Sequence, residues 1–152
     1  MATNPGRAAF KRAIAALSLP DAEPLTMKHS PFAESLGAAI LSVDLEKRIL
    51  RARFTPGVQY LQGAGVLQGG ILATMLDFSM AFITLAVLPE EASCATAQLN
   101  VHYLKAAHPG TYIAQSGIEK VGKRLVFNYS SIVPEGGGDA VASATGVFSV
   151  LV

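Results

Sequence analysis

One carboxylate stands alone in a long uncharged stretch of this chain. Between Arg53 and Glu90 every residue is uncharged except Asp77, which lies in the apolar run ILATMLDFSMAF. If that run is helical, no Lys or Arg lies within one turn of Asp77 to pair with it. Burial without a partner raises the pKa of a carboxyl group and suits it to general-base catalysis. A structural carboxylate that is hydrogen-bonded in the core is the alternative interpretation.

The turn Gln68-Gly69-Gly70, directly before that run, is a second candidate. Glycines at the start of a helix let a ligand approach the first backbone N–H groups, which have no acceptor inside the helix. Such N–H groups favour an anion or a developing oxyanion. Taken alone, the turn fits a simple helix cap better than a binding site.

The spacing of these two groups limits how they could cooperate. Eight positions separate Gly69 from Asp77, so on one helix they lie about 12 Å apart at ~1.5 Å per residue. A small carbonyl group cannot contact both within one chain. If both act on one bond, the carboxylate must come from a second subunit whose helix runs alongside in the opposite sense. A two-fold dimer provides that arrangement.

The other reactive side chains show no comparable pattern. His29, His102 and His108 lack metal-ligand spacing with one another or with Cys94, so no metal site is expected. Cys94 has no local base and is interpreted as a small packed residue. Neither a G-x-S-x-G elbow nor a P-loop is present.

The chain around these groups predicts one α+β domain over residues 1–152. Residues 1–30 are expected to form an N-terminal helix, over about 5–17, with its lead-in. Residues 29–37 are expected to be a loop or short turn, and 37–44 with 47–55 a hairpin of strands. Gly69-Gly70 opens a long helix that Pro89 ends. Four strands in meander are predicted to follow, and a sheet of this size is needed to wrap the helix.

The first strand after the helix alternates clearly over residues 96–105. The alternation predicts that one set of side chains shares a face, namely Thr96, Gln98, Asn100 and His102. The opposite face is predicted to hold Ala97, Leu99, Val101 and Tyr103.

Composition narrows the class of protein. The chain is 51% hydrophobic and only 15% charged, so apolar surface is expected to be hidden by oligomerisation. Residues 71–88 have the minimum length of a membrane span, but Asp77 near the centre would cost roughly 2.5–3.5 kcal/mol on insertion scales. A helix enclosed by protein, and no membrane partner, is therefore the preferred interpretation. The net charge of +1 is too small to produce the positive field that attracts nucleic acid. The single cysteine fits the reducing cytoplasm.

From Phe32 to Val152 the chain resembles the hotdog-fold acyl-CoA thioesterases, especially the phenylacetate-pathway type. In that family a helix begins H-G-G and carries Asp or Glu nine positions after the His. The corresponding run here is Gln68-Gly69-Gly70 through Asp77. The segments FAESLGAAILSVDLEKRILRARF and TAQLNVHYLKAAHPG look like the family's opening hairpin and its strand after the helix. The resemblance implies a hotdog fold, in which a curved antiparallel β-sheet wraps a long central helix.

The resemblance also implies roles for individual residues. Asp77 corresponds to the catalytic carboxylate, either as general base for water or as nucleophile on the thioester carbonyl. Gly69 corresponds to the N–H donor that polarises that carbonyl. Gln62 falls where relatives place the water or the thioester, and Thr96 where a Ser or Thr orients the water.

One residue departs from the family's motif, because Gln68 stands where the family has His. Glutamine can donate a hydrogen bond from its amide but cannot titrate near neutrality. We count it among the catalytic candidates, and we expect substrate contacts at Gly70, Ala81 and Asn100.

The implied activity is hydrolysis of a small aryl- or medium acyl-CoA thioester to the free acid and CoA. The implied assembly is a homodimer or homotetramer with sites at the dimer interface. Coenzyme A is then part of the substrate, and no separate cofactor is expected. Two alternatives stay open, a non-catalytic acyl-CoA-binding protein and a hydratase. A hydratase would need a catalytic His, for which only His102 or His108 could serve.

Overall fold

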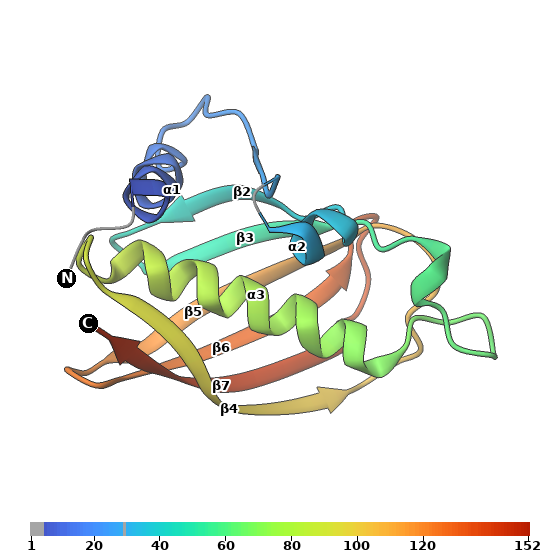
Figure 1. The fold of residues 1–152 in the computed structure, drawn as a ribbon. Helices are drawn as coiled ribbons and strands as arrows, with labels where there is room; N and C mark the ends of the chain where they lie inside the picture. The colour runs from blue at the N-terminus through green and yellow to red at the C-terminus, as the bar shows by residue number, and fades with distance from the viewer. Residues whose placement is uncertain (1–4, 29) are drawn as a thin grey trace.

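A curved seven-stranded antiparallel sheet wraps one long helix in the computed structural model, which describes residues 5–28 and 30–152 (Figure 1). The helices are α1 (Pro5–Ala16), α2 (Pro31–Ser35) and α3 (Gly69–Val87), with a 3-10 turn at Val58–Tyr60. The strands are β1 (Leu25–Thr26), β2 (Ala39–Asp44), β3 (Ile49–Phe54), β4 (Ser93–Tyr103), β5 (Tyr112–Val121), β6 (Leu125–Pro134) and β7 (Ala142–Leu151). The predicted α+β hotdog architecture is confirmed. His29 lies outside the described residues.

The elements before α3 follow the sequence pattern with two exceptions. The β2–β3 hairpin forms as predicted, and Arg48 takes a positive φ of 56° in its turn. Part of the predicted loop is instead the short helix α2, because Pro31 at its start has a φ already suited to a helix. Strand β1 was not predicted, since two residues are too few to show a period.

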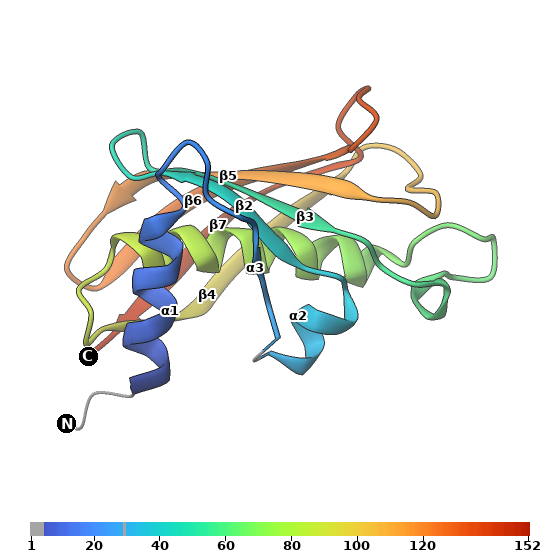
Figure 2. The same cartoon turned by 90° about the horizontal axis from the view of Figure 1, so that it is seen from above.

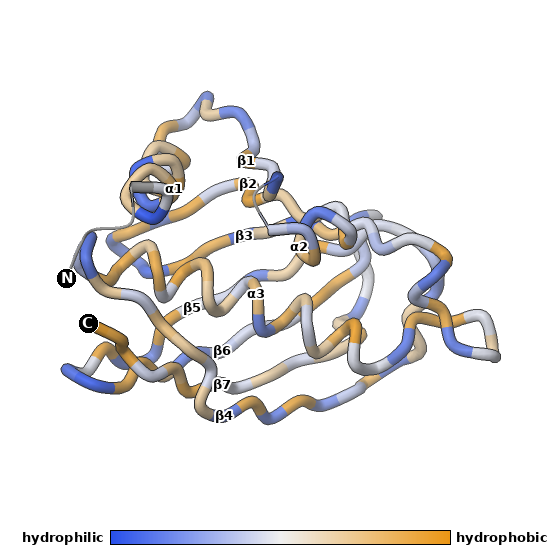
Figure 3. The backbone as a smooth tube through the Cα atoms, viewed as in Figure 1, coloured by the Kyte–Doolittle hydropathy of each residue, from blue (hydrophilic) through white to orange (hydrophobic). Residues whose placement is uncertain are grey.

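Helix α3 is apolar because protein covers one whole side of it. The residues that face the sheet are buried: Leu72, Met75, Leu76, Met80 and Ile83. By length and composition alone this helix could also cross a membrane, but packing on the sheet accounts for its composition. Figure 2 shows all three helices on the same side of the sheet, and Figure 3 shows hydrophobic segments along α3 and the strands beneath it.

The strand order is β1-β2-β3-β5-β6-β7-β4, which corrects the predicted meander of four strands. Strands β5, β6 and β7 do form a meander, but β4 pairs with β7 instead of β5. Strand β5 pairs with β3, and β4 lies at the far edge of the sheet beyond β7. Among the described residues no strand pairs with the other side of β4, and most residues of β4 are exposed.

A bulge in β4 changes the face on which Thr96 lies. Thr96 pairs with Phe148, whereas Gln98 pairs with Val147, so the register shifts between them. Phe148 is fully buried on the side of α3, and Thr96 therefore faces α3 too. The prediction that Thr96 shares a face with Gln98 was wrong, because an extra residue breaks the two-residue period.

Lys11 links α1 to the C-terminal end of α3 by hydrogen bonds. Its ammonium group is buried and donates hydrogen bonds to the carbonyls of Leu88 (3.2 Å), Ala92 (2.9 Å) and Pro89. A cation suits this place because Leu88 caps the C-terminus of α3, where partial negative charge accumulates, and the carbonyls of Pro89 and Ala92 in the following turn add acceptors. Burial lowers the pKa of Lys11. Ile14, on the same helix, is fully buried in the core.

Candidate active site

Asp77 lies on the side of α3 that β4 approaches, and it is half-buried. Thr96 Oγ1, brought over by the bulge in β4, donates a 2.7 Å hydrogen bond to Asp77 Oδ1. Burial raises the pKa of Asp77, and the hydrogen bond from Thr96 opposes that rise. Among the described residues no Lys or Arg forms an ion pair with it. Such a carboxylate has one oxygen oriented and a proton affinity suited to base catalysis.

Cys94 lies close enough to Asp77 for their charges to interact. Burial, together with the negative charge of Asp77, raises the pKa of the Cys94 thiol to about 11. Its Sγ is directed at the carbonyl of Ala81, 4.0 Å away. The thiol therefore stays protonated near neutral pH, which agrees with its interpretation as a packed residue and not a nucleophile.

At the start of α3, Gln68 caps the helix with its own side chain. Its Oε1 accepts a hydrogen bond from the N–H of Gly70. That N–H is therefore already in use, and the donor at the helix start is reduced to Gly69, whose position in the first turn has no helical acceptor. Because Oε1 is held, the Nε2 amino group is the part of Gln68 left to donate elsewhere.

Tyr103 is a neighbour of Gly69 that sequence analysis did not single out. A Cβ added at Gly69 would lie 3.3 Å from two carbons of the Tyr103 ring, so the glycine permits this close contact. Tyr103 as a whole residue is 55% exposed. The alternation of β4 placed Tyr103 on the face of Leu99 and Val101, but no local signal connected it to the helix start.

A cleft of about 450 Å³ lies at this end of α3 and is lined by Gln62, Gly69, Tyr103 and Lys105 among others. The Gln62 side chain accepts a 2.7 Å hydrogen bond from the N–H of Ala64, within its own turn. We call Gln62, Gln68, Gly69 and Tyr103 the helix-start cluster. Lys105 also pairs with Asp139 at the surface.

The candidate residues therefore form two groups within one chain. Asp77 and Thr96 make up the carboxylate cluster, in the middle of α3, and the helix-start cluster lies eight positions earlier. The structure brings Thr96 to Asp77 and Gln62 to Gly69, but it does not bring the two clusters together.

The expected substrate contacts are spread over both faces of the sheet. Gly70 belongs to the helix start, and Ala81 lies one turn after Asp77 on α3. Asn100 pairs with Thr145 and is exposed on the face of β4 that points away from α3. His102 shares that outer face, and no three metal-ligating side chains come together among residues 5–28 and 30–152.

Residues 64–141, which include the carboxylate cluster and all of the helix-start cluster except Gln62, match the family described as the thioesterase superfamily. A relative from Halobacterium salinarum, whose name assigns it provisionally to the esterases, is 36% identical over 95 residues. That match covers 58% of this chain and 62% of the relative, so it spans less than two thirds of the relative's length.

Solved structures agree with this family. A protein of Ralstonia eutropha, described as related to phenylacetic acid degradation and provisionally as a thioesterase, has 28% identity and a TM-score of 0.78, covering 92% of this chain and 98% of its own. The Escherichia coli PaaI protein of the phenylacetic acid degradation operon shares the fold at 18% identity and a TM-score of 0.76, covering 95% and 96%. A Bacillus halodurans protein solved with CoA has 31% identity and a TM-score of 0.63, covering 66% of each chain. This chain belongs to the thioesterase superfamily and has its hotdog fold.

Proposed function

We propose that this protein is an acyl-CoA thioesterase that hydrolyses a small aryl- or medium acyl-CoA to the free acid and CoA. Asp77 carries this proposal, as a half-buried carboxylate without an ion-pair partner among the described residues, whose pKa is raised and whose Oδ1 is held by Thr96. An idle charge in such a position would only reduce stability. The CoA bound to the Bacillus halodurans relative supports a CoA thioester as substrate.

In the proposed reaction the Gly69 N–H binds the thioester carbonyl oxygen and stabilises the charge that develops there. Asp77 then acts in one of two ways. As a base it takes a proton from the attacking water, and as a nucleophile it forms an anhydride that water later cleaves. In both cases the C–S bond breaks, hydroxyl from water ends on the acyl carbon, and the thiolate of CoA takes the proton.

We propose that the two clusters meet between subunits of a homodimer. Gly69 and Asp77 are about 12 Å apart along α3 at ~1.5 Å per residue, too far for one carbonyl. The edge of β4 has unpaired backbone groups that a second copy could use to extend the sheet. Two-fold symmetry would then give each dimer two identical sites, each with Gly69 from one chain and Asp77 from the other.

The activity is tested by measuring free thiol released from acetyl-, butanoyl-, octanoyl- and phenylacetyl-CoA. We expect Asp77→Asn to reduce turnover on the order of 10²–10⁴-fold, the usual contribution of a general base. The matched control is Asp21→Asn, which changes an exposed carboxylate in the linker after α1. Equal rates for wild type and Asp77→Asn would rule out this mechanism.

Sharing of the site is tested by mixing two inactive variants. Gly69→Val blocks the helix start against Tyr103, and Asp77→Asn removes the carboxylate. Subunit exchange at equal amounts should restore about a quarter of wild-type activity, because half of the dimers are mixed and each has one intact site. If each variant is inactive and the exchanged mixture stays inactive, the site is not shared.

A second candidate is an acyl-CoA-binding protein without turnover. Gln68 favours it, because this residue replaces the family's His and its Oε1 is occupied by the helix cap. This function predicts thermal stabilisation by acyl-CoA without thiol release from any member of the panel. A large gain of activity in Gln68→His would support it further.

A further inference from the structure

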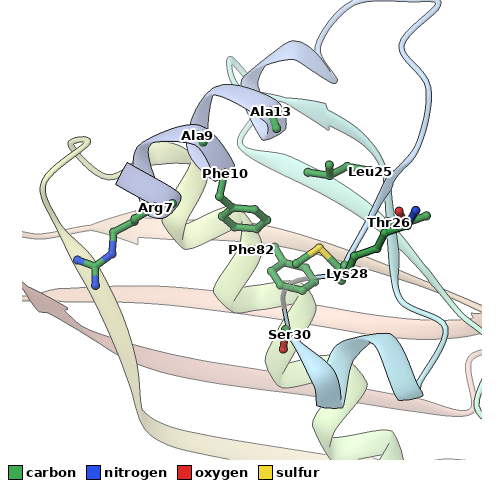
Figure 4. Close-up of a pocket in the computed structure, with 11 residues that line it drawn as sticks. Arg7, Ala9, Phe10, Ala13, Leu25, Thr26, Lys28, Ser30 and Phe82 are labelled. Atoms are coloured by element: carbon green, nitrogen blue, oxygen red, sulfur yellow. The ribbon is translucent and has the colours of Figure 1, made fainter. Parts of the chain in front are cut away.

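A second cavity, of about 580 Å³, opens between α1, residues 25–28 and the C-terminal half of α3 (Figure 4). The Phe10 ring of α1 and the Phe82 ring of α3 meet there edge to face, with centroids 6.1 Å apart. The other apolar residues that line it include Ala9, Ala13, Leu25 and Met27. We call it the α1 cavity, and its volume lies within the range of small-molecule sites, about 300–1,000 Å³.

A row of aromatic rings leads from Asp77 to this cavity. Phe78, the residue after Asp77, stacks parallel on Phe82 with centroids 5.8 Å apart and an interplanar angle of 6°. Asp77 and Phe82 are five positions apart, which is about 7.5 Å along α3 at ~1.5 Å per residue. Phe32 of α2 adds a further ring against Phe78, at 6.0 Å. An apolar group attached to a carbonyl at Asp77 could therefore lie along these rings and end in the cavity.

We propose that the α1 cavity holds the distal end of the acyl group and sets which acyl lengths are accepted. This inference rests on the proposed thioesterase function. The lining favours an uncharged alkyl or arylalkyl end, because most of its side chains are apolar. Two cations, Arg7 and Lys28, also line the cavity, and Figure 4 shows Arg7 extending away from the two rings. A charged acyl end would lose its hydration against the apolar part of the lining.

Helix α1 offers a way to fill the cavity without moving the helix. Ala9 and Ala13 are four positions apart and lie on one face of α1, toward the cavity. Different side chains anchor the helix, since Lys11 binds the end of α3 and Ile14 is buried in the core. Ala16, on the same helix, is exposed and does not line the cavity, so it provides a matched control.

The test compares kcat/KM for acetyl-, butanoyl-, hexanoyl- and octanoyl-CoA in wild type, Ala13→Phe and Ala16→Phe. In wild type we expect kcat/KM to rise about fourfold per added methylene until the cavity is full. Ala13→Phe should lower the ratio of kcat/KM for octanoyl-CoA to kcat/KM for acetyl-CoA by at least about tenfold, which is the contribution of two buried methylenes. Ala16→Phe should keep the wild-type ratio.

An unchanged ratio in Ala13→Phe, with the far-ultraviolet spectrum of wild type, would overturn the inference. If Ala13→Phe does not fold, Ala9→Phe at the exposed rim applies the same criterion. A change of oligomeric state in Ala13→Phe without a change in the ratio would mean that a second copy fills the cavity, which also overturns it.

Binding separates this inference from the proposed function. Calorimetry on Asp77→Asn should show tighter binding of octanoyl-CoA than of acetyl-CoA, and addition of Ala13→Phe should remove the difference. If this binding difference is found but wild type hydrolyses neither thioester, the proposed thioesterase function is wrong and the α1 cavity remains a ligand site. Equal binding of both thioesters, with hydrolysis intact in wild type, would sink the cavity assignment alone.

Discussion

Asp77 and Ser79 lie two positions apart on α3, and their surroundings are opposite. Ser79 faces the sheet, is fully buried, and its hydroxyl donates to the carbonyl of Leu76. Ser116 Oγ lies 2.7 Å from both Ser79 Oγ and Ser130 Oγ, so three hydroxyls from a helix and two strands satisfy one another. Asp77 lies toward the edge strand β4, is half-buried, and receives a side-chain hydrogen bond from Thr96.

On the same helix, Ser79 and its partners contribute to stability, whereas Asp77 is suited to reactivity. Neutral hydroxyls that are paired inside the core fix how α3 sits on the sheet at little cost. A carboxylate that is partly desolvated, with no cation beside it, has a raised pKa and lowers the stability of the ionised fold. Perturbed groups of this kind are concentrated at functional sites, and the comparison can be tested from both sides.

The largest effect is expected in the pH dependence of activity. Below the raised pKa of Asp77 the carboxylate is protonated, so kcat/KM should fall about tenfold per pH unit. Thr96→Val removes the hydrogen bond that lowers this pKa, and the acid limb should move to higher pH. Thr96→Ser keeps the hydroxyl and should restore the wild-type limb. If the acid limb of the Thr96→Val profile lies at the same pH as in wild type, a group other than Asp77 controls that limb.

A smaller effect is expected when the serine cluster is broken. Ser116→Ala leaves Ser79 and Ser130 buried with one partner fewer, which should cost about 1–3 kcal/mol of unfolding free energy. Chemical denaturation measures that loss, and kcat should stay unchanged because the cluster faces away from Asp77. Ser131→Ala changes a half-buried serine one position along β6 and is the control, with little expected effect. If Ser116→Ala lost as much activity as Asp77→Asn, the serine cluster could not be a purely structural counterpart of Asp77.

The smallest effect is a gain of stability in Asp77→Asn. The folded-state pKa of Asp77 is raised above its unfolded value, so the fold is favoured while the group is protonated and loses this advantage as pH rises through the folded pKa. At pH 7 the neutral Asn should therefore raise Tm slightly. Near pH 3, below the unfolded pKa of about 3.9, the two proteins should melt alike. A lower Tm for Asp77→Asn at pH 7 would mean that the carboxylate stabilises the fold.

The parts of the fold that local pattern encodes could be predicted from the sequence. The start of α3 at Gly69, its end before Pro89 and the isolation of Asp77 follow from residue types within one segment. The resemblance to hotdog thioesterases, carried by Gln68-Gly69-Gly70 and Asp77, gave the family correctly.

What the sequence did not reveal depends on contacts between distant segments. The pairing of β4 with β7 instead of β5, and the bulge that turns Thr96 toward Asp77, arise only when the sheet assembles. The Tyr103 ring on Gly69 and the cavity under α1 join residues that are far apart along the chain. The cap that Gln68 forms on Gly70 depends on a side-chain rotamer, which no spacing rule specifies.

The bulge in β4 also matters for aligning this chain with its relatives. Thr96, which contacts Asp77, lies three positions before Leu99. The side chains of Thr96 and Leu99 nevertheless lie on the same face of β4, because the bulge adds one residue between them. In a relative with a regular strand, the equivalent hydroxyl would stand two positions before the residue aligned with Leu99. An ungapped alignment would then set that hydroxyl against Ala97 and report the position as lost. One gap at Ala97 restores the correspondence.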